Sequence, residues 1–140
     1  MIESPLHAES AQRSRLRDFL HDCIASTRTD QPARLAEAAE VFCLTAETRT
    51  ILAAMSASGA YESAAMLVIG TETRFMLSRG GPGLCLATTV LSDGVEDATA
   101  EAATLALALL AAHAVALLAN HDGASIATGV TGVPIGARLN

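Results

Sequence analysis

Residues 97–120 read D-A-T-A-E-A-A-T-L-A-L-A-L-L-A-A-H-A-V-A-L-L-A-N, and this stretch decides the fold. Ala and Leu are the apolar residues with the strongest helix preference, so the composition predicts one long helix over the whole stretch. Between residues 102 and 119 only Thr104 and His113 are polar. Six of the seven large aliphatic side chains spread over roughly 220° of the helical wheel, so we expect this helix to be buried on most sides.

The same stretch is long enough to cross a membrane, since about 20 apolar residues suffice. Membrane helices usually carry Lys or Arg at one end and Trp or Tyr near the lipid headgroups. Neither end of this stretch has such residues, and the flanking charges are acidic: Asp93, Glu96, Asp97, Glu101 and Asp122. We therefore expect a core helix and no membrane partner.

Three earlier stretches have helical periodicity. Residues 8–27 predict an amphipathic helix, with apolar side chains at i, i+3, i+4, i+7 and i+8: Leu16, Phe19, Leu20, Cys23 and Ile24. Residues 32–44 and 46–57 continue this pattern. Asp30 is placed to cap the second helix and Gly59 to end the third. Thr45 is either a break or an N-cap, so the sequence leaves open whether there are two or three N-terminal helices.

After Tyr61 the periodicity gives way to short apolar runs. Residues 64–70, 74–79 and 84–91 are predicted as three strands, joined by a turn at 71–73 and a Gly-rich loop at 80–83. Short connections join antiparallel neighbours, so these strands predict a three-stranded antiparallel meander. With the N-terminal helices before it and the long apolar C-terminal helix after it, the fold class is α+β.

The predicted strands are apolar on both faces. Met66 and Val68 face one way, and Leu67 and Ile69 face the other. A sheet with one solvated face would instead alternate apolar and polar residues. We expect the long helix to cover one face and either the N-terminal helices or a second subunit to cover the other, which favours a homodimer.

The length of the chain fits one domain, residues 1–123, followed by an apolar, Gly-rich arm at residues 124–140. Asp93 and Glu96 have the spacing of a capping box for the long helix, and residues 120–123 have the composition of a helix end. The arm has one charge and cannot build a core of its own. We expect it to lie extended on a groove or on a partner.

The net charge is −6, and the basic residues, all Arg, form no continuous stripe. This disfavours nucleic-acid binding. Without Lys, a Schiff base and a P-loop are excluded. Cys23, Cys43 and Cys85 lie far apart among apolar residues, so we expect buried, reduced thiols in a cytoplasmic protein. The first nine residues show no secretory signal.

His113 is the main candidate for chemistry, because it lies among leucines on the helical wheel. Burial would keep its ring neutral and leave one nitrogen free as a base or ligand. However, no second titratable residue has a spacing that fixes it beside the ring. We therefore expect a core histidine bonded to a backbone carbonyl or to Thr88 or Thr89.

Two arginines are weaker candidates for ligand binding. Arg74 lies at the start of a predicted strand, and Arg79 precedes the Gly-rich loop, whose amides could hold an anion. A strand follows that loop, so it lacks the helix of a phosphate-binding loop. The other histidines lack metal-ligand spacing. The sequence predicts no catalytic residue, metal site or cofactor.

These observations favour a small cytoplasmic, homodimeric interaction or regulatory module without catalytic chemistry, which binds a further protein partner or a small apolar ligand. The first alternative is a small-molecule binding domain, with an aliphatic pocket between sheet and long helix and a ligand oriented by His113 or Arg74. The second alternative is an enzyme that uses His113 with a cysteine or an arginine.

Overall fold

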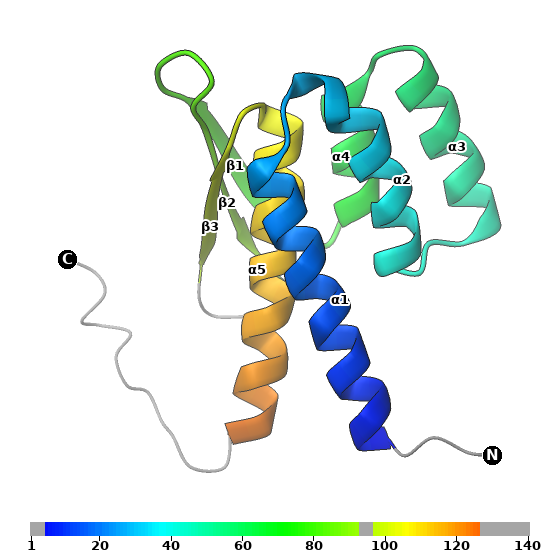
Figure 1. Cartoon of the computed structure of the whole chain (residues 1–140), viewed down its shortest axis with the longest axis vertical. Helices are drawn as coiled ribbons and strands as arrows, with labels where there is room; N and C mark the ends of the chain where they lie inside the picture. Colours follow the sequence, from blue (N-terminus) through cyan, green and yellow to red (C-terminus); the bar gives the residue numbers. More distant parts are fainter. Residues whose placement is uncertain (1–4, 93–96, 127–140) are drawn as a thin grey trace.

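The computed structural model describes residues 5–92 and 97–126 of the chain (Figure 1). Its elements are α1 (Pro5–Ala25), the 3-10 turn η1 (Arg28–Asp30), α2 (Gln31–Val41), α3 (Ala46–Ala57), α4 (Tyr61–Ile69), β1 (Arg74–Arg79), β2 (Cys85–Val90), β3 (Ala98–Ala102) and α5 (Leu105–Ile126). The strands form an antiparallel sheet in the order β1-β2-β3. The predicted α+β class, with helices, a three-stranded meander and a long C-terminal helix, is confirmed.

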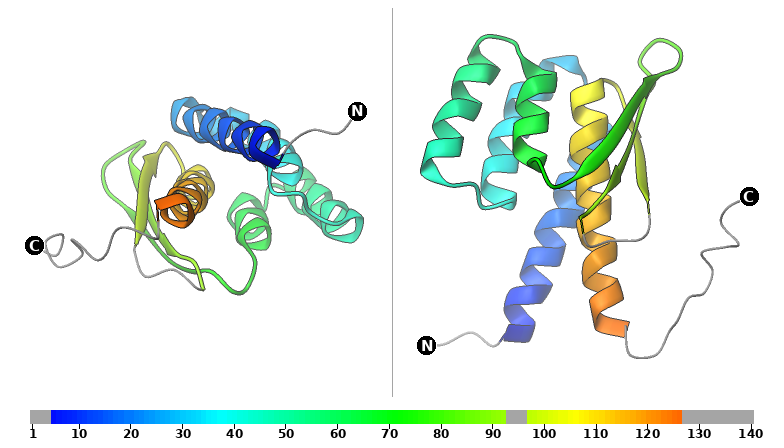
Figure 2. Two further views of the ribbon diagram at one scale, coloured as in Figure 1. Left: turned by 90° about the horizontal axis from the view of Figure 1, so that it is seen from below. Right: turned by 180° about the vertical axis from the view of Figure 1, so that it is seen from behind.

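The centre of the fold is α5. Every residue from 106 to 114 is buried, because the sheet packs on one side of the helix and α1 and α4 pack on the others (Figure 2). Small alanine side chains let these neighbours approach the helix axis closely. The prediction that this stretch forms the central core helix is therefore confirmed.

The start of the long helix was predicted wrongly. Residues 98–102, expected in the helix, form β3. Ala98, Ala100 and Ala102 are buried and alternate with exposed Thr99 and Glu101, which is the period of a strand with one covered face. The helix propensity of alanine hid this alternation. At the other end α5 continues to Ile126 and does not stop at residues 120–123.

One predicted strand was also wrong. Residues 64–69 lie in α4, and Gly70 follows its end with a φ of 83°. The buried residues of α4 follow helical spacing: Ala64, Ala65, Val68 and Ile69. A short apolar run buried on several sides has no distinctive period, so helix and strand are not distinguished by sequence in such a run.

The N-terminal region contains three helices, not two. Thr45 caps α3, because its hydroxyl accepts a hydrogen bond from the Thr48 backbone N–H (3.2 Å). Asp30 does not cap α2 as predicted. Its carboxylate instead accepts a hydrogen bond from the Thr27 backbone N–H (2.8 Å) and so closes η1. Gly59 follows the end of α3 with a φ of 81°, as its predicted C′ role requires.

The described helices all lie on one side of the sheet (Figure 2). The N-terminal helices pack on α5 and do not cover the second sheet face, which corrects one of the two arrangements expected from the sequence. The inner face, toward α5, has small side chains such as Ala87 and Ala100. The outer face stays open among the described residues, with Met76 71% exposed.

Three further expectations depend on the described ranges. Among the described residues, no helix is long and apolar enough to span a membrane. The predicted capping box at Asp93 and Glu96 lies outside these residues. Of the predicted arm, residues 124–126 continue α5, and residues 127–140 lie outside the described part.

The connection from α2 to α3 contains a cysteine in an unusual backbone conformation. The Leu44 N–H bonds the Ala39 carbonyl (3.0 Å), and the Cys43 N–H bonds the Glu40 carbonyl (3.2 Å). This is the Schellman pattern, in which the residue after the C-cap is left-handed and usually Gly. Cys43 occupies that position with a φ of 54° and is exposed, which corrects the expectation that all three thiols are buried.

Replacing Cys43 by Gly is therefore expected to stabilise the protein. Relief of the left-handed strain raises the free energy of unfolding by about 1–2 kcal/mol. The greater conformational freedom of Gly in the unfolded chain lowers it again by about half of this amount. Thermal unfolding should show a midpoint about 2–3 °C higher. The control Cys43→Ala keeps the Cβ atom and should leave the midpoint nearly unchanged; an equal rise in both variants would contradict the strain.

Candidate functional site

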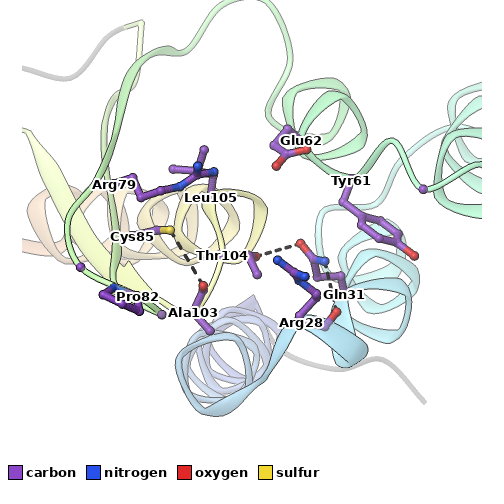
Figure 3. Close-up of a pocket in the computed structure, with 13 residues that line it drawn as sticks. Arg28, Gln31, Tyr61, Glu62, Arg79, Pro82, Cys85, Ala103, Thr104 and Leu105 are labelled. Atoms are coloured by element: carbon purple, nitrogen blue, oxygen red, sulfur yellow. Dashed lines mark hydrogen bonds between the residues drawn. The ribbon is translucent and has the colours of Figure 1, made fainter.

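A pocket of about 460 Å³ opens where four segments of the chain meet (Figure 3). These segments are the turn from η1 into α2, the start of α4, the β1–β2 loop and the junction of β3 with α5. The polar and charged residues that line it are Arg28, Gln31, Tyr61, Glu62, Arg79, Cys85 and Thr104. The pocket thus depends on the tertiary fold, because its walls come from segments far apart in sequence.

A chain of hydrogen bonds fixes one wall of the pocket. The Thr104 hydroxyl oxygen accepts from the Leu107 N–H (3.1 Å), which caps the first turn of α5, and the same hydroxyl donates to Gln31 Oε1 (2.8 Å). Gln31 Nε2 donates to the carbonyl oxygen of Arg28 (3.1 Å). The starts of α2 and α5 are therefore held together at the place where Arg28 enters the pocket.

The opposite wall is built by the β1–β2 hairpin. Arg79 ends β1 and pairs with Cys85, which is buried on the inner face, so the Arg79 side chain lies on the side of α5. The loop is closed by hydrogen bonds from the Gly80 N–H to the Leu84 carbonyl (2.8 Å) and from the Leu84 N–H to the Gly81 carbonyl (3.1 Å). Gly83 has a φ of 69°, a left-handed conformation that glycine adopts without the steric cost of a Cβ atom.

The charges of the pocket are two guanidinium groups and one carboxylate. Arg28 and Arg79 extend into the space on either side of Thr104, and Glu62 lies at a third corner (Figure 3). Among the described residues, no carboxylate lies within ion-pair distance of either guanidinium. The pocket carries one net positive charge, whereas the whole chain carries −6.

The three residues predicted for ligand binding lie in three different places. Arg79 lines the pocket. Arg74 is at the other end of β1, opposite Val90, on the outer face of the sheet. His113 lies in the middle of α5 and is 7% exposed. The structure therefore does not bring His113 and Arg74 together around one ligand.

His113 is surrounded by aromatic and aliphatic residues. Its ring meets Phe42 edge-on, with centroids 5.1 Å apart, and Phe42 meets Phe19 in the same way at 5.4 Å. Thr89 does not bond the ring, because its hydroxyl donates to the Ala112 carbonyl (3.2 Å). His113 Nδ1 is buried and has no hydrogen-bond partner among the described residues. Burial lowers the pKa of His113 to about 4, so the ring is neutral at pH 7.

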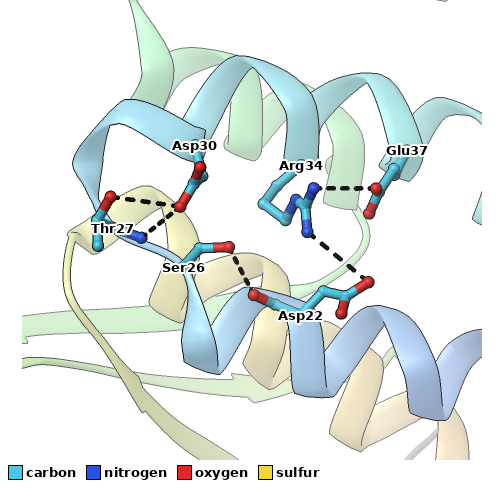
Figure 4. A network of polar contacts seen from close by, with 6 residues as sticks. All are labelled: Asp22, Ser26, Thr27, Asp30, Arg34 and Glu37. Carbon is cyan, nitrogen blue, oxygen red and sulfur yellow. Dashed lines mark hydrogen bonds and ion pairs between the residues drawn. The ribbon is translucent and has the colours of Figure 1, made fainter.

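The cysteines are not arranged as nucleophiles. Burial raises the pKa of the Cys23 thiol to about 12, and the opposing effect of nearby Arg34 is smaller. Arg34 instead joins α2 to α1 through Asp22 (3.7 Å) and also pairs with Glu37 (3.0 Å) one turn further along α2, as Figure 4 shows. Cys85 lies at the base of the pocket with its sulfur 3.9 Å from the Ala103 carbonyl oxygen. Both buried thiols therefore pack as small apolar groups.

Most of the pocket was not found from the sequence. Arg79 was singled out together with its loop, but Arg28, Gln31, Glu62 and Thr104 were not. A strand, β2, follows this loop as predicted, so the loop itself does not have the context of a phosphate-binding loop. The structure instead brings the start of α5, about 20 residues further along the chain, beside the loop. The available signal was Thr104, a polar residue directly before an apolar helical run.

Comparison with known proteins gives no relative from which a function could be transferred: no protein-family model, curated protein or solved structure matches the chain. Within the described part of the chain, no group of three or more His, Cys, Asp or Glu residues is arranged to hold a metal ion.

The burial of His113 gives a prediction for pH dependence. The folded-state pKa of about 4 is below the ordinary histidine pKa of 6.5, so between these values the unfolded chain binds a proton that the folded chain does not. Stability is therefore lost as the pH falls from 6.5 toward 4. Between pH 7 and pH 5, His113 should cost the wild type about 2 kcal/mol of unfolding free energy.

The matched variant is His113→Leu, which cannot titrate and leaves no buried nitrogen unpaired. Urea unfolding at both pH values should show that the stability gap between variant and wild type widens by that amount at pH 5. Parallel losses in the two proteins would mean that the buried ring does not govern the acid response.

Proposed function

We propose that this chain acts by association, as a homodimeric interaction module without catalytic chemistry of its own. The observation that supports this proposal is the open outer face of the sheet. The face consists of Arg74, Met76 and Ser78 on β1, Leu86, Thr88 and Val90 on β2, and Thr99 and Glu101 on β3. None of these residues is buried, and no described element packs over them.

The charges on the outer face lie on opposite edge strands. Arg74 is on β1, whereas Glu101 is on β3 and exposed Asp97 directly precedes β3. The register places Arg74 opposite Val90. Continued by one residue, the register between β2 and β3 places Val90 opposite Asp97. One row across the sheet therefore runs from a positive charge through an apolar residue to a negative charge.

This pattern is complementary to itself under one two-fold rotation. If the axis runs parallel to the strands, β1 of one copy lies over β3 of the other, and Arg74 faces Asp97 twice by symmetry. If the axis runs across the strands, Asp97 faces Glu101 and like charges repel. The charges thus favour face-to-face packing with the axis along the strands, with Met76, Leu86 and Val90 as the apolar part of the contact.

The size of the face sets the expected strength. Three strands of about six residues cover roughly 14 by 20 Å, or about 300 Å² in projection. Over both copies this is about 600 Å², below the roughly 1,200 Å² at which stable specific interfaces begin, so the dimer should be weak and concentration-dependent. The three cysteines Cys23, Cys43 and Cys85 are free, which is typical of a reducing compartment and supports a cytoplasmic location.

A charge exchange tests the dimer. Arg74→Asp and Asp97→Arg each place like charges across the interface, so each variant should raise the dimer dissociation constant about tenfold or more. The double variant restores opposite charges and should recover most of the affinity. Sedimentation equilibrium over a hundredfold concentration range measures these constants.

The matched control is Arg17→Asp, which makes the same change of charge at an exposed position of α1. It should leave association unchanged. If wild type stays monomeric over the whole range, or if the double variant is no better than the single ones, association through this face is wrong.

A further inference from the structure

We infer that the pocket between the start of α2, α4, the β1–β2 loop and the start of α5 binds a small phosphate ester. Its volume of about 460 Å³ falls in the range of pockets that hold small molecules. This binding is separate from association, because the pocket lies on the side of α5 and not on the outer face of the sheet.

The two arginines carry the inference. Among the described residues, Arg34 pairs with Asp22 and Glu37, and Arg49 pairs with Glu40 at 2.7 Å, whereas Arg17 and Arg74, like Arg28 and Arg79, form no ion pair. The chain has 15 acidic residues for 9 basic ones, so carboxylates are in excess. Arg28 and Arg79 differ from Arg17 and Arg74 in that both face one cavity, from opposite walls (Figure 3). Their repulsion would be relieved by an anion bound between them.

The remaining donors favour phosphate over carboxylate. A phosphate monoester carries close to two negative charges at pH 7 and several acceptor oxygens, so it can pair with both guanidinium groups at once. A single carboxylate neutralises one of them. The helix α5 has 22 residues, and the positive end of its dipole lies at this side of the pocket. In its first turn the N–H groups of Leu107 and Ala108 bond to Thr104, so the N–H groups of Leu105 and Ala106 remain available to the ligand.

Glu62 limits what else the ligand can be. Its carboxylate lies on the α4 side of the pocket and would repel a second phosphate placed there. A hydroxyl or amino group on the ligand could instead donate a hydrogen bond to it. The pocket therefore fits a monophosphate of a small polyol, sugar or amino alcohol better than a polyphosphate.

The experiment is an NMR titration of the full ¹⁵N-labelled chain, at a concentration below that of association, with glycerol 3-phosphate. The expected result is saturable shifts of the amide signals of Gly81, Gly83, Leu105 and Ala106, with a dissociation constant below 1 mM. Arg28→Gln and Arg79→Gln should each weaken binding at least tenfold. Both side chains are exposed, so the fold should tolerate these changes.

Two further variants sharpen the test. Arg74→Gln removes the same charge from the same strand but on the outer face, so it should change the dissociation constant less than twofold. Gly81→Asp adds a carboxylate to the loop, where an added Cβ has no atom within 4 Å, and should abolish binding while the amide spectrum stays folded.

Three outcomes would overturn the inference. One is the absence of saturable shifts at 10 mM ligand. Another is an equal loss of binding in Arg74→Gln and Arg79→Gln, which would indicate nonspecific attraction to positive charge. The third is saturation by succinate but not by glycerol 3-phosphate, which would assign the pocket to dicarboxylates.

Discussion

The structure depends on the burial of residues 106–114 of α5 from all sides. A helix can be surrounded by a sheet and by other helices only if its side chains leave room for them, and the alternation of Ala with Leu between residues 106 and 114 provides that room. The same constraint reaches the sheet, whose inner face carries Ala87, Ala98, Ala100 and Ala102. It also limits polar groups in the core. The Thr89 hydroxyl donates a hydrogen bond to the Ala112 carbonyl. By contrast, His113 Nδ1 has no hydrogen-bond partner among the described residues, and the ring is neutral at pH 7.

The central helix also explains why the sheet has an open face. The N-terminal helices bury their apolar residues against α5 and against one another: Leu16, Phe19 and Leu35 are among the least exposed side chains. Because these helices gather around α5, they lie on one side of the sheet and do not reach its second face. That face is correspondingly mixed, with Thr88 and Thr99 linked across the strands at 3.2 Å. The open face is therefore a consequence of how the core is filled, and its charges determine what can pack on it.

The sequence predicted the secondary structure correctly where the apolar residues followed one clear period. The prediction failed where the pattern was compatible with both a helix and a strand. In the predicted stripe of α1, Leu16, Phe19 and Cys23 are buried, whereas Ile24 is 49% exposed and does not face the core. Of the two roles that the sequence left open for Thr45, the structure shows the N-cap. Residues 64–69 form a continuous apolar run without a clear period, and residues 98–102 alternate like a strand but are rich in a helix-forming residue. The pocket was less predictable still. Arg28, Glu62, Arg79 and Thr104 come from four segments, so their proximity is a property of the tertiary fold.

The assignment of residues 98–102 to β3 matters for more than the boundary of a helix. Because β3 ends at Ala102, α5 begins beside the β1–β2 loop, and Thr104 joins the start of that helix to Gln31. The pocket exists because of this junction. The same sheet separates the two proposed activities, since Arg74 and Arg79 are five residues apart on one strand. An odd separation in a strand places two side chains on opposite faces. A ligand at Arg79 and a partner at Arg74 would therefore not compete for the same surface, and both could be bound at once.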